Sequence, residues 1–351
     1  TADTKGSKSV AIGRGALNAQ NFTSATDSNN TAVGDKAGYA VTTGTNNTLV
    51  GTSAGDAMNT GTRNVAVGTG ALGVHTSGTD NVAIGSVDAA AAEVLGSNLT
   101  GGGNIAIGGG TLANYTASNS LAVGYRALKA STDGHTNIGI GNYAGDAITT
   151  GDNNIMIGYD CGSYTTNFIT GGQNVCIGHY ITAGGTADNY ANALGYNLTA
   201  HGGYTTLGKG ADDIRASHGS TTWSTVSDER YKKDIEDAKA GLSFINALKP
   251  RTFKYKTLGE LPETFRAYEA DSTKVFKNEN TNHGFIAQEV KQAIDADSDL
   301  KDGFRLWDER GDGSQEIAET ALIPMLVKAI QELSAKNTAL EAKVTALENA
   351  E

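Results

Sequence analysis

The first two thirds of the chain repeat a short motif in which apolar and small residues alternate before a glycine. A typical copy is Asn-Val-Ala-Val-Gly at residues 64–68. The alternation has a period of two, so each copy predicts a short β-strand with Val65 and Val67 on one face and Ala66 on the other. The glycine recurs most often after 17 residues. The twelve marker glycines are Gly13, Gly34, Gly51, Gly68, Gly85, Gly108, Gly124, Gly141, Gly158, Gly178, Gly195 and Gly208.

Such strands are too short to be stable alone, but coils of one repeat each can stack. Stacking places every strand beside its copy at about 4.8 Å per step, so twelve coils would form a rod roughly 55 Å long. The sequence therefore predicts a β-solenoid, a parallel β-roll, over residues 1–210. A flexible linker is excluded, because Gly/Ser linkers do not repeat valine and isoleucine in phase.

Each position of the motif has an expected role. Glycine would supply the positive φ that turns the chain at the corner of a coil. Asparagine would suit either a turn or a ladder of stacked amides. The alanine face would permit close approach between subunits.

After residue 210 the repeat stops. Residues 211–226 are polar and irregular, and we expect a neck with Trp223 as an aromatic anchor. Residues 227–351 contain all three prolines, whereas 40 of the 46 glycines precede them. We therefore expect a separate mixed α/β domain downstream of the neck.

Within that domain, apolar spacing predicts a helix over 238–248 and an amphipathic stretch over 285–294. Pro250 favours an extended segment at 252–255. Residues 257–282 are polar and predict a projecting arm or loop.

The last segment, about 320–351, has the pattern of a coiled coil. β-Branched residues dominate one heptad position and leucines occupy the other, which fits two or three strands, and Asn337 inside the seam would fix the register. Such a helix could align stacked coils, which can otherwise pair one repeat out of step. The predicted trimerisation seam is Ile323, Leu326, Ile330, Leu333, Asn337, Leu340, Val344 and Leu347.

Composition excludes several function classes. The net charge of −11 argues against nucleic acid as a partner. No apolar run approaches the ~20 residues of a membrane span, so membrane insertion is not expected. Cys161 and Cys176 occupy different phases of the repeat and predict two free, buried thiols. We expect no metal or other cofactor, because Asp308, Asp312 and Glu316 have the wrong spacing for a calcium loop.

The repeat offers no convincing catalytic set. Its histidines are scattered over different coils, and it has no recurrent pair of carboxylates of the kind that glycoside hydrolysis uses. Tyrosines crowd its second half, where exposed rings could stack on sugars. Packing between coils or between subunits is the commoner role for any one of them. These tyrosines are Tyr115, Tyr125, Tyr143, Tyr159, Tyr164, Tyr180, Tyr190, Tyr196 and Tyr204.

The junction reads Ser-Asp-Glu-Arg-Tyr-Lys-Lys-Asp-Ile at 227–235. Taken alone, this stretch favours a capped helix start with a solvated charged face. However, it resembles the start of the intramolecular chaperone at the C-terminus of phage endosialidases and tail fibres. Residues 242–255 and 283–290 fit the family's next two blocks, and the coiled coil follows. Residues 8–13, Lys-Ser-Val-Ala-Ile-Gly, resemble the head repeats of trimeric autotransporter adhesins, although the copies here are longer and less regular. That second resemblance implies a left-handed β-roll assembled as a trimer.

The chaperone resemblance implies self-cleavage by a serine–lysine dyad, which would be Ser227 and Lys232. Serine is a poor nucleophile until a base takes its proton. Lysine is a base only when neutral, and burial or nearby positive charge favours that form. The Ser227 hydroxyl would reach the carbonyl of Val226 through a five-membered ring, so the expected cut is Val226–Ser227. Candidate assisting residues are Asp228, Arg230, His283 and Glu289.

The spacing of five residues puts the two side chains on different faces of either a helix or a strand. A turn or a partner subunit would have to bring them together, so we expect cleavage to wait for trimerisation. The function we expect is a trimeric viral tail fibre or tail-spike tip, located in the virion after assembly in the host cytoplasm. Its partners would be two further copies of itself, other virion tail proteins and a host cell-surface glycan or protein receptor. A cellular surface adhesin with the same self-cleaving chaperone is the alternative.

Overall fold

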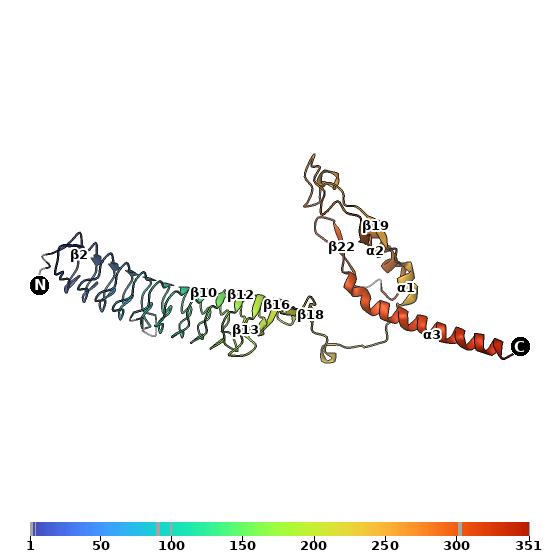
Figure 1. The fold of residues 1–351 in the computed structure, drawn as a ribbon, viewed down its shortest axis with the longest axis horizontal. Helices are drawn as coiled ribbons and strands as arrows, with labels where there is room; N and C mark the ends of the chain where they lie inside the picture. The colour runs from blue at the N-terminus through green and yellow to red at the C-terminus, as the bar shows by residue number, and fades with distance from the viewer. Residues whose placement is uncertain (1–2, 4, 89–91, 99, 301–303, 351) are drawn as a thin grey trace. The chain divides into compact units, whose positions relative to one another are not determined.

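The computed structural model describes residues 3, 5–88, 92–98, 100–300 and 304–350. The chain divides into two compact units, Thr1–Asp228 and Glu229–Glu351 (Figure 1). The first contains the repeat, and the second contains the C-terminal helix. Over the described ranges, no helix combines the length and the apolar character that crossing a membrane requires.

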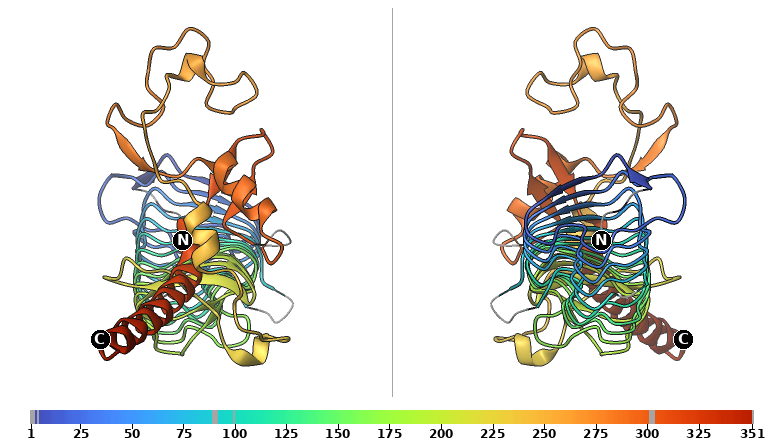
Figure 2. Two further views of the ribbon diagram at one scale, coloured as in Figure 1. Left: turned by 90° about the vertical axis from the view of Figure 1, so that its right-hand side faces the viewer. Right: turned by 90° about the vertical axis from the view of Figure 1, so that its left-hand side faces the viewer.

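The repeat forms a parallel β-solenoid, as predicted, with one strand of the main sheet in each coil (Figure 1). Neighbouring strands pair in register, so that Val65 lies beside Val82 and Ala66 beside Ala83. Figure 2 looks along the stack, where successive coils lie over one another. Within the described residues, the twelve parallel strands of this sheet are β2 (Val10–Ile12), β4 (Thr31–Val33), β5 (Thr48–Val50), β6 (Val65–Val67), β7 (Val82–Ile84), β8 (Ile105–Ile107), β9 (Leu121–Val123), β10 (Ile138–Ile140), β11 (Ile155–Ile157), β12 (Val175–His179), β14 (Asn192–Tyr196) and β16 (Tyr204–Lys209).

Two shorter parallel ladders support the coils at other positions. β1 (Gly6–Ser7) pairs with β3 (Thr26–Asp27), and β13 (Thr182–Ala183) pairs with β15 (Thr199–Ala200). The remaining contacts between coils are backbone hydrogen bonds between turns, such as Leu128 N–H to the Ala144 oxygen at 3.0 Å. Each coil is therefore tied to the next around its perimeter.

Where the central strand residue is alanine, it faces the interior of the solenoid in every strand from β4 onwards, so the prediction that it faces another subunit is wrong. Ala66 is fully buried, whereas Val65 and Val67 are only partly buried. The reason is the narrow interior, which large side chains from the turns already occupy. At the coil whose central strand residue is Gly139, a Cβ atom would lie only 2.8 Å from Leu128 Cγ. Most inward positions therefore hold small residues, although Leu49 and Met156 also point inwards, and the β-branched residues point outwards.

The motif asparagines form a buried ladder, the second of the two arrangements that the sequence allowed. The N–H of Asn64 donates to Asn47 Oδ1 at 2.9 Å, and the N–H of Asn81 donates to Asn64 Oδ1 at 3.0 Å. Each of these residues is fully buried. Serine replaces asparagine in two coils, at the half-buried Ser9 and at Ser120, and each hydroxyl accepts from the next N–H in the ladder. The buried ladder positions are Asn30, Asn47, Asn64, Asn81, Asn104, Ser120, Asn137, Asn154 and Asn174.

The marker glycines are required by the close approach of neighbouring corners. Gly68 has φ 126°, and a Cβ atom on it would lie 1.9 Å from the Gly85 oxygen. A side chain at this position would therefore collide with the backbone of the next coil. The expected role of glycine at the corner is confirmed.

Antiparallel strands finish the C-terminal end of the solenoid. β17 (Asp212–Ser217) pairs with β16, and β18 (Ser224–Thr225) pairs with β17. Part of the segment expected to be an irregular neck is therefore strand. These strands supply hydrogen-bond partners to the last parallel strand, which would otherwise present an open edge.

The second unit is a small mixed α/β structure followed by the long helix. Its two hairpins pair β19 with β20 and β21 with β22. Its core contains Phe244, Val290 and Leu306, all at most 3% exposed. The elements are η1 (Glu229–Tyr231), α1 (Leu242–Ala247), β19 (Arg251–Phe253), η2 (Leu258–Glu260), β20 (Asn282–Gly284), α2 (Ala287–Ala296), β21 (Trp307–Glu309), β22 (Gln315–Ile317), η3 (Glu319–Leu322) and α3 (Ile323–Glu348).

Helix α3 uses one face to pack on its own unit. Ala329 is buried, and the Glu332 carboxylate accepts a hydrogen bond from the N–H of Leu242 at 2.9 Å, at the start of α1. The predicted seam lies elsewhere on the helix and is largely exposed, with Ile330 at 66% and Leu347 at 70%. The helix therefore carries an apolar seam that its own chain does not cover.

Candidate functional site

The predicted cleavage site lies in an exposed connecting segment. Val226 is 48% exposed and follows β18, and Ser227 is exposed as well. Ser227 is the second-last residue of the first compact unit, whereas Lys232 belongs to the second. Lys232 is exposed and directly follows η1, where its N–H donates to the Glu229 oxygen at 2.9 Å. The catalytic pairing of Ser227 with Lys232 therefore stays a prediction.

Two of the candidate assisting residues lie beside the junction. Asp228 is half-buried, and Arg230 lies in η1 with its side chain exposed. Both belong to a segment of exposed, charged residues that runs on to residue 239. Their assisting roles remain predictions.

The other two candidates lie in the body of the second unit, where Glu289 is engaged in an ion pair. Its carboxylate accepts hydrogen bonds from both ends of the Arg251 guanidinium, at 2.9 and 2.5 Å. These bonds hold the pKa of Glu289 below its ordinary value. A carboxylate held in this way is a weak proton acceptor, so the pair favours a structural role. His283 lies in β20 opposite Thr252 of β19 and is exposed.

Arg251 is the residue that sequence reasoning missed at this place. It lies 38 positions before Glu289, and the antiparallel pairing of β19 with β20 brings its strand near α2. The sequence offered one signal for Arg251, because this residue follows Pro250 and directly precedes the extended segment predicted at 252–255. The ion pair links the hairpin to the helix and so holds two of the family blocks together.

A continuous apolar surface runs along the outside of the solenoid, and we name it the Val/Ile face. It consists of the apolar outward residues of the parallel strands, which stack in two columns because the strands are in register, and Thr31, Thr48 and Asn192 interrupt one of the columns. Ile105 and Ile107 are 39% and 36% exposed, and Leu194 is 54% exposed. Its members are Val10, Ile12, Val33, Val50, Val65, Val67, Val82, Ile84, Ile105, Ile107, Leu121, Val123, Ile138, Ile140, Ile155, Ile157, Val175, Ile177 and Leu194.

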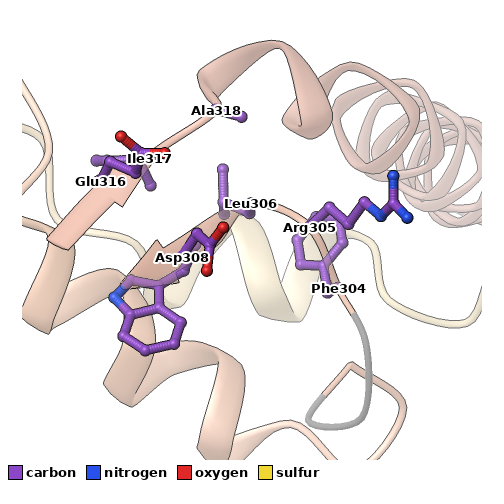
Figure 3. Close-up of a pocket in the computed structure, with 8 residues that line it drawn as sticks. Phe304, Arg305, Leu306, Asp308, Glu316, Ile317 and Ala318 are labelled. Carbon is purple, nitrogen blue, oxygen red and sulfur yellow. The ribbon is translucent and has the colours of Figure 1, made fainter. Parts of the chain in front are cut away.

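A cavity of about 800 Å³ opens beside the second hairpin of the second unit (Figure 3). Within the described part of the chain, its lining contains no serine, cysteine, lysine or histidine. Among the described residues, no three of His, Cys, Asp and Glu lie together as a metal site would require. The cavity is lined by Phe304, Arg305, Leu306, Trp307, Asp308, Glu316, Ile317 and Ala318.

Comparison with known families gives one match, at the start of the second unit. Residues 227–298 match the family described as chaperone of endosialidase. The chaperone match begins at Ser227, one residue before the end of the first compact unit. It covers both predicted dyad residues and both downstream blocks, and it ends just after α2, so α3 lies outside it. No curated protein and no solved structure matches the chain.

Proposed function

We propose that this chain is a trimeric viral tail fibre or receptor-binding tip, in which the chaperone domain drives trimerisation and folding and then releases itself. The observation that carries the proposal is the junction at Ser227, where a stacked β-solenoid meets the chaperone match. Because such a chaperone is part of the same chain as the rod, the rod would be the segment whose folding it assists. The rod would then attach the virion to a surface of the host.

Trimerisation is supported by two apolar surfaces that a single chain leaves open. Monomeric proteins rarely expose apolar patches larger than a few hundred Å². The Val/Ile face extends over successive coils, and the seam of α3 is exposed over its length. Both surfaces are regular along one direction, which suits contact with parallel copies of the same surface. We therefore assign both to contacts with two further copies of the chain.

Self-cleavage would proceed by transfer of the Val226 acyl group to Ser227. The Ser227 hydroxyl gives its proton to the Lys232 amine and attacks the Val226 carbonyl carbon. The peptide C–N bond then breaks, and the Ser227 nitrogen takes a proton and becomes a free amine. The resulting ester, which joins Val226 to Ser227 Oγ, is hydrolysed by water. Because a lysine accepts a proton only when neutral, and burial favours the neutral form, the exposure of Lys232 supports completion of the site by a partner subunit.

The test is a comparison of the full chain with single variants on a denaturing gel, combined with the mass of the native product. Wild type should give two bands, with the smaller piece beginning at Ser227 and the larger one trimeric under native conditions. Ser227→Ala and Lys232→Ala should each give one intact band. The matched controls Ser224→Ala and Lys233→Ala should be cut like wild type. An uncut wild-type chain, or equal cutting of Ser227→Ala, would refute self-cleavage, and a monomeric product would refute the trimeric fibre.

A further inference from the structure

The second half of the solenoid carries five tyrosines that form one continuous row, the tyrosine ladder. Successive rings contact each other edge to face, with centroid distances of 5.5, 6.1, 5.4 and 5.8 Å. The planes of neighbouring rings cross at 80–87°. The ladder consists of Tyr125, Tyr143, Tyr159, Tyr180 and Tyr196.

The ladder has two alternating kinds of rung. Tyr125, Tyr159 and Tyr196 directly follow a marker glycine, whereas Tyr143 and Tyr180 come one residue later. The later pair has positive φ, 59° and 56°. Their N–H groups donate to the oxygens of the tyrosines one coil before, at 2.9 and 3.0 Å. Backbone geometry therefore sets the alternation, and each kind of rung recurs in every second coil.

The two exposed rungs are both of the first kind. Tyr159 is 39% and Tyr196 is 47% exposed, whereas Tyr125, Tyr143 and Tyr180 are half-buried. Like rungs are separated by two coils, which is roughly 9.6 Å at the spacing of parallel strands. Aromatic faces at this interval are held rigidly, because each exposed ring is braced by the edge of its neighbour.

The surroundings of the ladder are polar, unlike those of the Val/Ile face. Tyr196 pairs in register with exposed His179 on one side and exposed Lys209 on the other. At the opposite end the Arg126 guanidinium lies over the Tyr125 ring, 5.1 Å from its centroid. Every rung also carries a hydroxyl group. Such a surface offers apolar ring faces and hydrogen-bonding groups together. A purely apolar contact between subunits would not use the hydrogen-bonding groups.

We propose that the tyrosine ladder binds a linear, uncharged glycan with β-1,4 linkages along the axis of the solenoid. In such a chain successive sugars are turned over, so every second sugar presents the same face, and the two exposed rungs, Tyr159 and Tyr196, lie two coils apart. Sugar C–H faces would stack on the rungs, and their hydroxyl groups would bond to the polar flanks. Acidic residues outnumber basic ones in the first unit, which disfavours a polyanionic glycan. This inference rests on the proposed attachment function and names the chemical class of its receptor.

The ring variants Tyr159→Ala and Tyr196→Ala test the ladder in the full chain, with Tyr190→Ala as the matched control. Tyr190 is 56% exposed, and among the described residues its ring makes no aromatic contact with a ladder ring. Calorimetric titration would use β-1,4-linked glucose and N-acetylglucosamine hexasaccharides as probes, with the α-1,4-linked glucose hexasaccharide for comparison. We expect each ladder variant to weaken binding of a β-linked probe by about tenfold, with the control unchanged. Tyr159→Phe should retain most of the binding, because it keeps the ring.

Three results would overturn the proposal: no binding of either β-linked probe, equal binding of the α-linked probe, or loss of assembly by sedimentation in the ladder variants. The last result would place the ladder between subunits. A parallel measurement of attachment to host cells separates this proposal from the function on which it rests. If wild type and both ladder variants attach equally, the ladder proposal fails and attachment stands. If wild type does not attach, the attachment function itself fails.

Discussion

Replacing Asn64 by alanine tests whether the amide ladder holds neighbouring coils together. The Asn64 side chain donates from Nδ2 to Asn47 Oδ1 at 3.2 Å and to the Gly78 oxygen at 3.0 Å. Its Oδ1 accepts from the N–H and from Nδ2 of Asn81, at 3.0 and 3.1 Å. The change therefore removes bonds to the coils on both sides.

The cost follows from which groups remain buried without a partner. Asn47 Oδ1 keeps the bond from the Asn64 backbone, and Asn81 Nδ2 keeps its bond to the Gly101 oxygen. The Asn81 N–H and the Gly78 oxygen lose the bonds described above, and both residues are buried. Leaving a buried polar group unsatisfied costs about 1–3 kcal/mol. Two such groups give a local destabilisation of about 2–6 kcal/mol.

In a stacked structure this loss falls on the neighbouring coils rather than on the whole unit. The suitable assay is therefore native-state hydrogen exchange, measured on peptides that cover residues 61–85 and, for comparison, residues 138–158. Exchange should accelerate at least about 30-fold in the first peptide and stay unchanged in the second. The control Asn59→Ala, which removes an exposed asparagine, should change neither. Unchanged exchange over 61–85, or an equal effect of the control, would refute the reasoning.

Three further predictions concern the thiols, the helix seam and the second hairpin. Iodoacetamide should modify both cysteines in denaturant but neither in the native protein. Both thiols are buried, and burial raises the pKa of Cys161 to about 12. Rapid labelling of the native protein would contradict this prediction. Leu333→Asp should abolish assembly in a sedimentation experiment, because it places a charge in the seam, whereas Thr345→Asp outside the seam should assemble normally. The Ser314 hydroxyl, together with backbone N–H groups, lowers the pKa of Asp312 to about 2. The carboxylate therefore stabilises the hairpin above pH about 4, and this contribution should fade as the pH falls towards 2. Denaturant titrations should show that slope in wild type and not in Asp312→Asn.

The strands of the solenoid were predictable because their signal is local and recurs in phase. What the alternation could not decide is which face lies inside. That choice depends on the width of the coil, and therefore on residues far from the strand, such as Leu128 opposite Gly139. Strand β17 was missed for a related reason. Residues 212–217 lack clear alternation, and they become a strand because β16 offers them an edge to pair with.

The candidate site was predictable only as far as a motif reaches. The residues around Ser227 carry the family pattern, and the family match begins at that residue. The ion pair of Arg251 with Glu289 joins positions 38 residues apart and depends on how the hairpin packs beside α2. The tyrosine ladder was partly predictable. Its residues are visible in the sequence, but their alternation becomes meaningful only when the coils are in register.

The regularity that makes the solenoid predictable also explains why its assembly would need a separate clamp. If copies meet through the Val/Ile face, a slip by one coil replaces valine and isoleucine by residues of almost the same size. Such a slip loses the contacts of one terminal coil, for instance those of Val10 and Ile12, which is worth only about 3 kcal/mol for two exposed apolar side chains. Correcting the slip would require breaking the contacts of every other coil, so the error would be trapped kinetically. Under the proposed function, a seam on α3 that contains Asn337 would set the register before the coils meet, and the second unit would not be needed after that step.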